Sequence, residues 1–391
     1  MKNLNAAILA IQPSATLAIS SLAKQMAQQG HQVSNFSAGE PDFDTPEFIK
    51  DACSEALRKG QTKYTPVNGI PRLCEAIAAK LQRENGLVYK PSQIVVSCGA
   101  KHSLALIFQT LLTPGDEVLV PSPFWLSYPE MIRVAGGVPV PVRATRANDF
   151  KVTPADLERA ATKRTVAMLI NSPCNPTGTM YTPDEIRALG ATALRLGLAI
   201  VSDEIYEKMV YDGNQQVSMA SLSPELYAST ITVNGFSKAY AMTGWRLGYA
   251  AGPVDFMQAM GALQSHCASA PTTFAQCGAI AALEQAQGAD SIAVMVRAFD
   301  ERRQRIYALM SAIPGVKCPK PTGAFYVFPD ISSFGLDSVA FAQRLLAEQQ
   351  VAVVPGIAFD ADACVRLSYA CSLAEIEKGM ARFAKFCASL R

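Results

Sequence analysis

Histidine and tryptophan are scarce in this sequence, with three and two copies among 391 residues. The histidines stand far apart at positions 31, 102 and 266, and none of the ten cysteines forms a Cys-x-x-Cys pair. Zinc and related metal centres draw on several such residues at short spacings, so the pattern predicts no metal site. It also predicts no disulfide framework, and we expect the cysteines to be small core residues in a reducing cytoplasm.

Blocks of like charge and long apolar runs are also missing. The 35 basic and 33 acidic side chains leave a formal net charge of +2, which argues against nucleic acid or a membrane surface as a partner. The apolar run from Ala6 to Ile11 is too short for a signal-peptide core, and no run approaches the roughly 18 residues of a membrane span. No G-x-G-x-x-G motif is present, which argues against a nicotinamide-binding site. We therefore expect a cytoplasmic protein that recognises its substrate by individually placed charges.

Short apolar runs recur between segments of helical character. They do not alternate polar and apolar residues, which is typical of strands that are covered on both faces. Strands that alternate with helices predict a parallel sheet with right-handed crossovers, and hence an α/β fold. The runs occupy residues 94–96, 117–120, 138–142, 166–170, 198–201 and 231–233.

Several helix starts carry recognisable caps. Thr45 is expected to cap a helix that begins at Pro46, and residues 182–185 and 372–375 have the pattern of capping boxes. From about residue 285 onward, short strands at 324–328, 351–354 and 364–369 lie among longer helices, which indicates a smaller α+β domain. The predicted division is an N-terminal segment 1–45 that packs with the small domain, a large domain 46–284 and the small domain 285–391.

Polar motifs follow three of the predicted strands, at the edge where parallel sheets bind ligands. They are Asn175-Pro176-Thr177-Gly178, Asp203-Glu204-Ile205-Tyr206, and Gly235-Phe236-Ser237-Lys238, the last followed by Arg246. Each motif alone has an ordinary structural explanation as a turn, a buried acid or a solvated lysine. In this order and spacing, however, they form a single pattern.

With these motifs, the sequence resembles the fold-type I, class I aminotransferases that depend on pyridoxal phosphate (PLP), and most of all the bacterial aspartate aminotransferase subgroup. The resemblance extends over essentially the whole chain, from Pro13-Ser14-Ala15-Thr16 to Val365-Arg366-Leu367-Ser368-Tyr369. It implies the PLP-dependent transferase fold, in which a large domain with a mostly parallel seven-stranded sheet is joined to a smaller α+β domain. It also implies that the protein is a homodimer with shared active sites.

The resemblance assigns catalytic roles to residues that suit the chemistry of PLP. Lys238 would hold the cofactor as a Schiff base and, once displaced, move a proton from the substrate's Cα. Asp203 would keep the pyridine nitrogen protonated, since an acid at that position attracts the positive ring. Tyr206 and Asn175 would hydrogen-bond the 3′ oxygen of the ring, and Trp125 would stack on its face.

The cofactor phosphate would be bound where Gly99-Ala100-Lys101 opens a helix, because backbone N–H groups at a helix N-terminus attract an anion. Arg246 would add a charge-assisted contact. The family often has serine three residues before the lysine, but Gly235 stands there, and Ser237 cannot be assumed to replace that hydroxyl. By resemblance, Tyr64 reaches the phosphate of the neighbouring subunit.

Arg366 matches the arginine that binds the substrate α-carboxylate, with the backbone of Gly39 nearby. Lys101, helped by Ser14 and Thr16, matches the group that binds the distal carboxylate in the bacterial subgroup, although Lys101 has the alternative role of serving the phosphate. Aspartate and glutamate are therefore the expected donors, with oxaloacetate and 2-oxoglutarate as acceptors. The residues assigned to the substrate are Ser14, Thr16, Gly39, Lys101, Trp125, Asn175 and Arg366.

Other activities stay open on the same fold. Relatives that act on prephenate tend to carry a lysine just before Pro-Ser, and the uncharged Gln12 at that position predicts weak or absent prephenate activity. Transamination of alanine, aromatic amino acids or prephenate is an alternative, as is a PLP-dependent lyase. A non-catalytic regulator would need a helix-turn-helix module ahead of Ser14, where only thirteen residues precede it.

Overall fold

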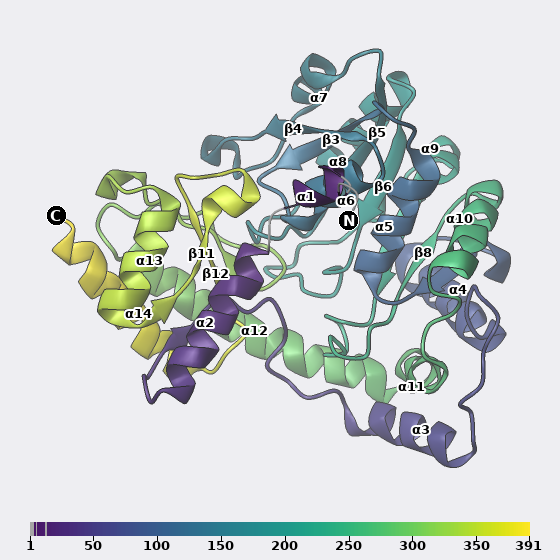
Figure 1. Ribbon diagram of the computed structural model, residues 1–391, viewed down its shortest axis with the longest axis horizontal. Coiled ribbons are helices and arrows are strands. Elements are labelled where there is room, and N and C mark those ends of the chain that lie inside the picture. The colour runs from purple at the N-terminus through teal and green to yellow at the C-terminus, as the bar shows by residue number, and fades with distance from the viewer. Residues whose placement is uncertain (1–3, 5, 12–13) are drawn as a thin grey trace.

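A computed structural model describes residue 4, residues 6–11 and residues 14–391. Its centre is a seven-stranded sheet with helices on both faces, and a smaller group of strands and helices lies beside it (Figure 1). The strands of the large sheet, in spatial order, are β2 (Ile94–Ser97), β8 (Gly248–Ala251), β7 (Thr230–Gly235), β6 (Ala199–Asp203), β5 (Thr165–Asn171), β3 (Glu117–Ser122) and β4 (Val138–Arg143).

Six of these strands run in the same direction, and β8 is antiparallel to both of its neighbours, β2 and β7. The expected α/β architecture with a mostly parallel seven-stranded sheet is therefore confirmed. Six of the seven strands coincide with the predicted apolar runs, and β8 was not anticipated. In β2, Val95 belongs to one apolar cluster while Ile94 and Val96 belong to another, because successive side chains point to opposite faces of the sheet. The absence of polar alternation thus reflects a sheet buried on both sides.

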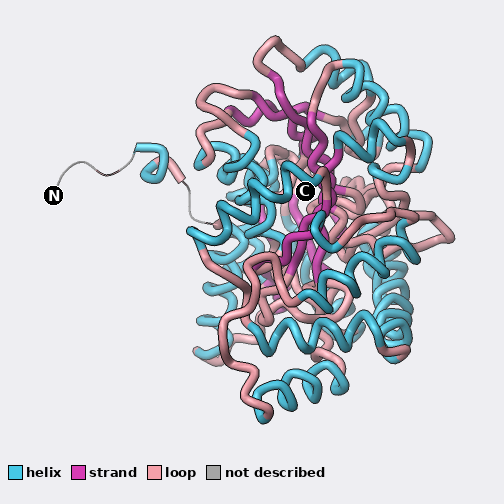
Figure 2. Tube along the Cα trace, turned by 90° about the vertical axis from the view of Figure 1, so that its right-hand side faces the viewer, coloured by secondary structure: helices cyan, strands magenta, loops and turns pink. Residues whose placement is uncertain are grey.

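Helices cover the two faces of the sheet and form much of the smaller part, as Figure 2 shows in cyan around the magenta strands. The α-helices are α1 (Ala6–Leu9), α2 (Ala15–Gln28), α3 (Glu47–Arg58), α4 (Pro71–Asn85), α5 (Ala100–Leu111), α6 (Ser127–Val134), α7 (Pro154–Ala160), α8 (Pro183–Arg195), α9 (Pro224–Ser229), α10 (Val254–Cys267), α11 (Thr273–Glu284), α12 (Gln287–Ser311), α13 (Ser338–Gln349) and α14 (Leu373–Ser389). The 3-10 helices are η1 (Pro91–Gln93), η2 (Arg146–Asn148), η3 (Met219–Ser221), η4 (Ser332–Phe334) and η5 (Gly356–Phe359).

The caps agree with the sequence only in part. Thr182 and Glu185 form the expected capping box of α8, and Ser372 caps α14 by accepting the N–H of Glu375. Thr45 does not cap α3. Its hydroxyl donates to the backbone oxygen of Ala241 at 2.8 Å and accepts the indole N–H of Trp245 at 2.9 Å, so a tertiary contact replaces the local one.

The smaller part combines segments from both ends of the chain. Its strands are β1 (Ser34–Asn35) paired with β10 (Val351–Ala352), and β11 (Val354–Pro355), β12 (Val365–Ser368) and β9 (Tyr326–Val327) in a second sheet. The long helix α12 connects this part to the large sheet along one side of the molecule (Figure 1). Within the described residues, no helix is long and apolar enough to span a membrane.

Candidate active site

A cavity of about 590 Å³ lies beyond the carboxyl ends of β5, β6 and β7, which is where a parallel sheet binds ligands. It brings together residues that are up to 352 positions apart in the chain, from Ser14 to Arg366. Of the residues predicted from sequence, those that line it are Ser14, Thr16, Gly39, Ala100, Lys101, Trp125, Asn175, Asp203, Tyr206, Lys238, Arg246 and Arg366.

Two predicted residues lie elsewhere. Gly99 is the N-cap of α5, next to Ala100, which does line the cavity. Tyr64 does not line the cavity of its own chain, and its side chain is 95% exposed. The position of Gln12, which motivated the prephenate prediction, falls outside the described residues.

The cavity has an excess of positive charge. Five cationic side chains line it, against the two carboxyl groups of Glu40 and Asp203. Such a surface attracts ligands with several negative charges, because a cavity with low-dielectric walls concentrates the field. The five cations are Lys24, Lys101, Lys238, Arg246 and Arg366.

Lys238 follows β7 and points to the floor of this cavity. Its Nζ donates to the backbone oxygen of Gly39 at 2.6 Å and lies 5.9 Å from the ring centroids of Tyr206 and Phe325. Burial lowers the pKa of Lys238 to about 8, and the nearby charge of Arg366 acts in the same direction. A substantial fraction of this amine is therefore neutral, and nucleophilic, near physiological pH.

Asp203 ends β6, and its carboxyl group is 3% exposed. Oδ2 accepts the hydroxyl of Tyr128 at 2.7 Å and Oδ1 accepts the backbone N–H of Ile205 at 3.2 Å. Burial raises the pKa of Asp203 to about 6, against the effect of these two hydrogen bonds and of Lys238. A buried acid at this position is suited to holding a proton on a cationic partner.

Arg366 lies on β12 and is 1% exposed. Its Nη1 donates to Oδ1 of Asn175 at 3.0 Å, its Nη2 donates to the backbone oxygen of Ser37 at 2.8 Å, and its Nε has no partner among the described residues. Both acceptors are neutral, and the buried guanidinium makes no ion pair within the described part of the chain. Burying an uncompensated charge is costly, and an anionic ligand would remove that cost.

The predicted phosphate site is a tight junction between α5 and Arg246. A Cβ at Gly99 would lie 2.4 Å from Nη2 of Arg246, and a Cβ at Gly248 would lie 2.2 Å from the backbone nitrogen of Ala100. Only glycine fits at these two positions. Arg246 donates to the backbone oxygens of Thr243 and Cys98 and makes no ion pair among the described residues. A helix N-terminus beside a guanidinium that has no carboxylate partner among the described residues is a suitable site for a dianion.

Lys101 and residues at the start of α2 line the same cavity. Nζ of Lys101 lies 4.7 Å from the ring centroid of Trp125, and burial, together with Arg246, lowers its pKa. Ser14 caps α2, and the buried Oγ1 of Thr16 has no partner among the described residues. These groups leave a cation and a hydroxyl available to a ligand.

Sequence reasoning missed two buried tyrosines at the site. Tyr128 binds Asp203, and Tyr326 shares a 2.8 Å hydrogen bond between hydroxyl oxygens with Tyr206 while lying 4.6 Å beneath the guanidinium of Arg366. Tyr128 lies three residues after Trp125, at the start of α6, and its backbone N–H donates to the backbone oxygen of Trp125 at 3.0 Å. Tyr326 lies inside a predicted apolar strand and gave no signal of its own.

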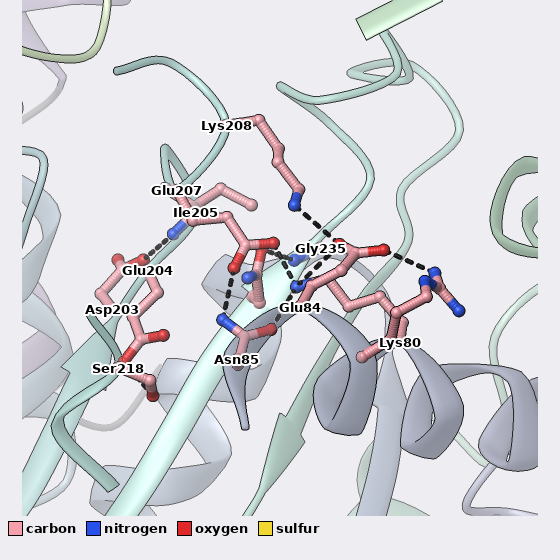
Figure 3. Close-up of polar contacts among 12 residues, drawn as sticks. Lys80, Glu84, Asn85, Asp203, Glu204, Ile205, Glu207, Lys208, Ser218 and Gly235 are labelled. Carbon is pink, nitrogen blue, oxygen red and sulfur yellow. Dashed lines mark hydrogen bonds and ion pairs between the residues drawn. The ribbon is translucent and has the colours of Figure 1, made fainter. Parts of the chain in front are cut away.

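A second polar cluster joins the turn after Asp203, which contains Glu207 and Lys208, to helix α4 (Figure 3). Glu207 receives Lys80 on one carboxyl oxygen and the amide of Asn85 at 2.8 Å on the other, and Lys208 pairs with Glu84 at 2.7 Å. Lys80, Glu84 and Asn85 all lie on α4, so this helix holds the turn after Asp203 in place through Glu207 and Lys208.

Glu204, in the same turn, has different hydrogen-bond partners. It accepts the hydroxyls of Ser202 and Ser218 on Oε1, each at 2.8 Å, and burial raises its pKa to about 7.

Taken together, a two-part α/β fold and a cavity that combines Lys238, Asp203 and Arg366 define a transferase of the PLP-dependent fold class. A model of the family described as aminotransferase class I and II matches residues 31–383. The chain belongs to this family.

Named relatives and solved structures agree with this assignment. The chain is 50% identical to an aspartate aminotransferase of Geobacillus stearothermophilus over 97% of each chain. It is 45% identical to an aspartate/prephenate aminotransferase of Thermus thermophilus over 98% of this chain and 99% of that one. A solved aspartate aminotransferase from Thermus thermophilus with maleate superposes with a TM-score of 0.95 at 43% identity, covering 99% and 100% of the two chains.

We expect Lys238 to be the lysine that reacts fastest with an aldehyde near neutral pH. Only a neutral amine attacks a carbonyl, so its labelling should rise with pH and reach half its maximum near 8, whereas an ordinary exposed lysine remains protonated until near 10.5. Competitive reductive methylation of the PLP-free protein with formaldehyde, followed by peptide mass mapping from pH 6 to pH 10, measures this. Exposed Lys59 serves as the internal control, and equal profiles for the two lysines would contradict the prediction.

Replacing Lys80 with methionine should destabilise the fold strongly, because Glu207 would remain buried without its cation. Breaking one side of a buried pair costs about 3–5 kcal/mol, whereas removing both charges is often nearly neutral. The double variant Lys80→Met/Glu207→Met should therefore recover most of the loss in urea unfolding. Lys50→Met, which breaks an exposed pair with Glu47, is the matched control and should leave the midpoint almost unchanged. A double variant no more stable than Lys80→Met would refute this account.

Proposed function

We propose that the protein is a PLP-dependent aminotransferase that moves an amino group between aspartate or glutamate and the 2-oxo acids oxaloacetate and 2-oxoglutarate. The observation that carries the proposal is the buried Arg366, which has only neutral partners and faces the same cavity as Lys238 and Asp203. Every amino acid and 2-oxo acid has a carboxylate that can compensate this charge, and a planar guanidinium binds carboxylates well. The names of the relatives support the same assignment.

PLP fits the residues around the cavity group by group. Its aldehyde requires an amine that is partly neutral, which Lys238 offers. Its pyridine nitrogen requires a buried acid such as Asp203, and its phosphate requires the N-terminus of α5 with Arg246. When bound, PLP supplies an electron-withdrawing ring that stabilises negative charge at the substrate's Cα.

The residues of the chain would then divide the remaining work. Nζ of Lys238 would accept the proton from the substrate's Cα in one half of the reaction and give a proton back to Cα in the other half, a form of acid–base catalysis worth about 10²- to 10⁴-fold. Asp203 would hold the proton at the ring nitrogen. Tyr206 would donate to the 3′ oxygen, as would the amide nitrogen of Asn175, since Oδ1 of Asn175 already accepts from Arg366. Trp125 would cover the face of the ring and exclude water.

A second carboxylate on the substrate would be bound at the mouth of the cavity. Lys101 supplies the charge, and the unpartnered hydroxyl of Thr16 and the hydroxyl of Ser14 supply hydrogen bonds. The excess of cations in the cavity fits a dicarboxylic substrate together with a phosphate dianion. On the evidence of Gln12, prephenate is proposed to be a poor acceptor.

A second copy of the chain would complete each site. Tyr64 is a large aromatic side chain that is almost fully exposed and lies outside the cavity of its own chain. We infer that it enters the cavity of a neighbouring protomer and donates to the cofactor phosphate. The protein is thus proposed to be a homodimer with shared active sites.

We also propose that the chain divides near residue 285, with the segment 1–45 packing on the C-terminal unit. Helix α11 ends at Glu284, and β1 from the N-terminal segment pairs with β10.

With PLP added, the purified protein should convert aspartate and 2-oxoglutarate to oxaloacetate and glutamate, and each half of the reaction should proceed alone with one equivalent of substrate. Release of ammonia without an acceptor would indicate a lyase instead. Arg366→Leu should lower kcat/KM about 100-fold or more for every donor, because each donor has an α-carboxylate. Lys101→Ser should reduce kcat/KM at least about tenfold more for aspartate than for alanine.

Arg187→Leu on α8 serves as the matched control, since Arg187 pairs with Asp184 far from the cavity, and it should leave the activity unchanged. Equal losses on aspartate and alanine in Lys101→Ser would assign that lysine to the phosphate. Prephenate turnover comparable to that of oxaloacetate would contradict the expected acceptor range.

Mixing Lys238→Ala with Tyr64→Ala should restore activity at a limiting PLP concentration if Tyr64 acts across the interface. Lys238→Ala lacks the amine, and Tyr64→Ala should need more PLP than the wild type. A hybrid dimer of the two contains one site with both changes and one site with neither. At a PLP concentration that saturates only the wild type, equal amounts of the variants should recover about one quarter of the wild-type activity after subunit exchange. No recovery from a mixture shown to contain hybrids would rule out a shared site.

A further inference from the structure

Tyr128 touches both of the groups that would contact the cofactor ring. It is the second residue of α6 and is 1% exposed. Its hydroxyl donates to Oδ2 of Asp203 at 2.7 Å, and its ring meets the indole of Trp125 edge-on, with 5.2 Å between centroids and an interplanar angle of 83°. One buried side chain therefore connects the acid proposed for the ring nitrogen with the aromatic proposed for the ring face.

Tyr128 also supplies the only side-chain hydrogen bond that Asp203 receives among the described residues. The other bond is the backbone N–H of Ile205 on Oδ1, so the two oxygens are fixed by donors from different elements. A carboxylate held in this way cannot rotate freely, and its ionised form is favoured over the protonated form. The titratable groups around this pair are Lys238, Tyr206 and Cys174, from the segments that follow β7, β6 and β5.

We propose that Tyr128 is a positioning residue that keeps Asp203 ionised and aligned and supports Trp125 from its edge. The inference rests on the proposed function, because the PLP ring is what the two residues contact. Hydrogen bonding by Tyr128 makes Asp203 a weaker base, so the shared proton stays on the ring nitrogen and the ring keeps its electron-withdrawing power. The phenol remains a donor throughout the working range of pH, since burial and the adjacent Asp203 raise its pKa well above the ordinary value.

The two contacts can be separated by substitution. Tyr128→Phe removes the hydroxyl and keeps the ring edge, whereas Tyr128→Leu removes both. Tyr181→Phe is the matched control, because it also removes a buried tyrosine hydroxyl, one that accepts the N–H of Val152 at 3.0 Å and does not line the cavity. Thermal unfolding of all three variants without PLP shows what each substitution does to the fold alone.

Tyr128→Phe should change the electronic state of bound PLP more than its binding. A hydrogen bond to a charged group is worth enough to move a titration by about one pH unit or more. Without the hydroxyl, Asp203 becomes a stronger base and draws the shared proton from the ring nitrogen, which then carries less positive charge. The nitrogen that joins Lys238 to the cofactor therefore retains its own proton to higher pH. The pH midpoint of the cofactor's visible absorbance should therefore rise by about one unit, and kcat with aspartate should fall about tenfold or more, while the Kd for PLP changes less than about threefold.

Tyr128→Leu should show the same rise and, in addition, weaken PLP binding by about tenfold, measured by quenching of tryptophan fluorescence. A double-mutant cycle tests whether Tyr128 acts through Asp203: in an Asp203→Asn background, Tyr128→Phe should have almost no further effect on the midpoint or on kcat. Losses that simply multiply in this cycle, or a midpoint in Tyr128→Phe equal to that of Tyr181→Phe, would overturn the inference. Absence of PLP binding by the wild type would instead refute the proposed function.

Discussion

The site depends on a buried cation that joins three separate stretches of the chain. Arg366 on β12 binds Asn175 in the turn after β5 and the backbone of Ser37 next to β1. Neither partner carries a charge, so no ion pair with them offsets the free energy lost when the guanidinium is removed from water. An arginine buried in this way lowers the stability of the fold, but it gives the cavity a strong and directional preference for a carboxylate.

Much of the fold could be predicted because buried parallel strands have a distinctive pattern. Six of the seven large-sheet strands were recognisable as short apolar runs, and the motif residues fell where those strands end. Strand β8 was not, since Gly-Tyr-Ala-Ala has little apolar bulk and its burial comes from neighbours on both sides. Thr45 was assigned to a helix cap because local rules cannot anticipate a contact with Ala241 and Trp245, about 200 positions away.

The candidate site shows the same division between local and tertiary information. Lys238, Asp203 and Arg366 stand in motifs that carry a chemical pattern, so their convergence on one cavity could be expected before the structure. Tyr128 and Tyr326 stand in stretches that look like ordinary core, and their roles depend on distances to Asp203 and Arg366 that only folding fixes. The exposure of Tyr64 is also a tertiary property, since nothing in the local sequence distinguishes it from a buried aromatic side chain.

Asp203 and Glu204 are adjacent acids with opposite surroundings. Asp203 points into the cavity, whereas Glu204 points to the other face of the sheet, where two serines hold it. Side chains alternate along a strand, so a slip of one position in β6 would exchange the two carboxyl groups. The register in which β6 pairs with β5 and β7 therefore determines that the carboxyl group of Asp203, and not that of Glu204, lines the cavity.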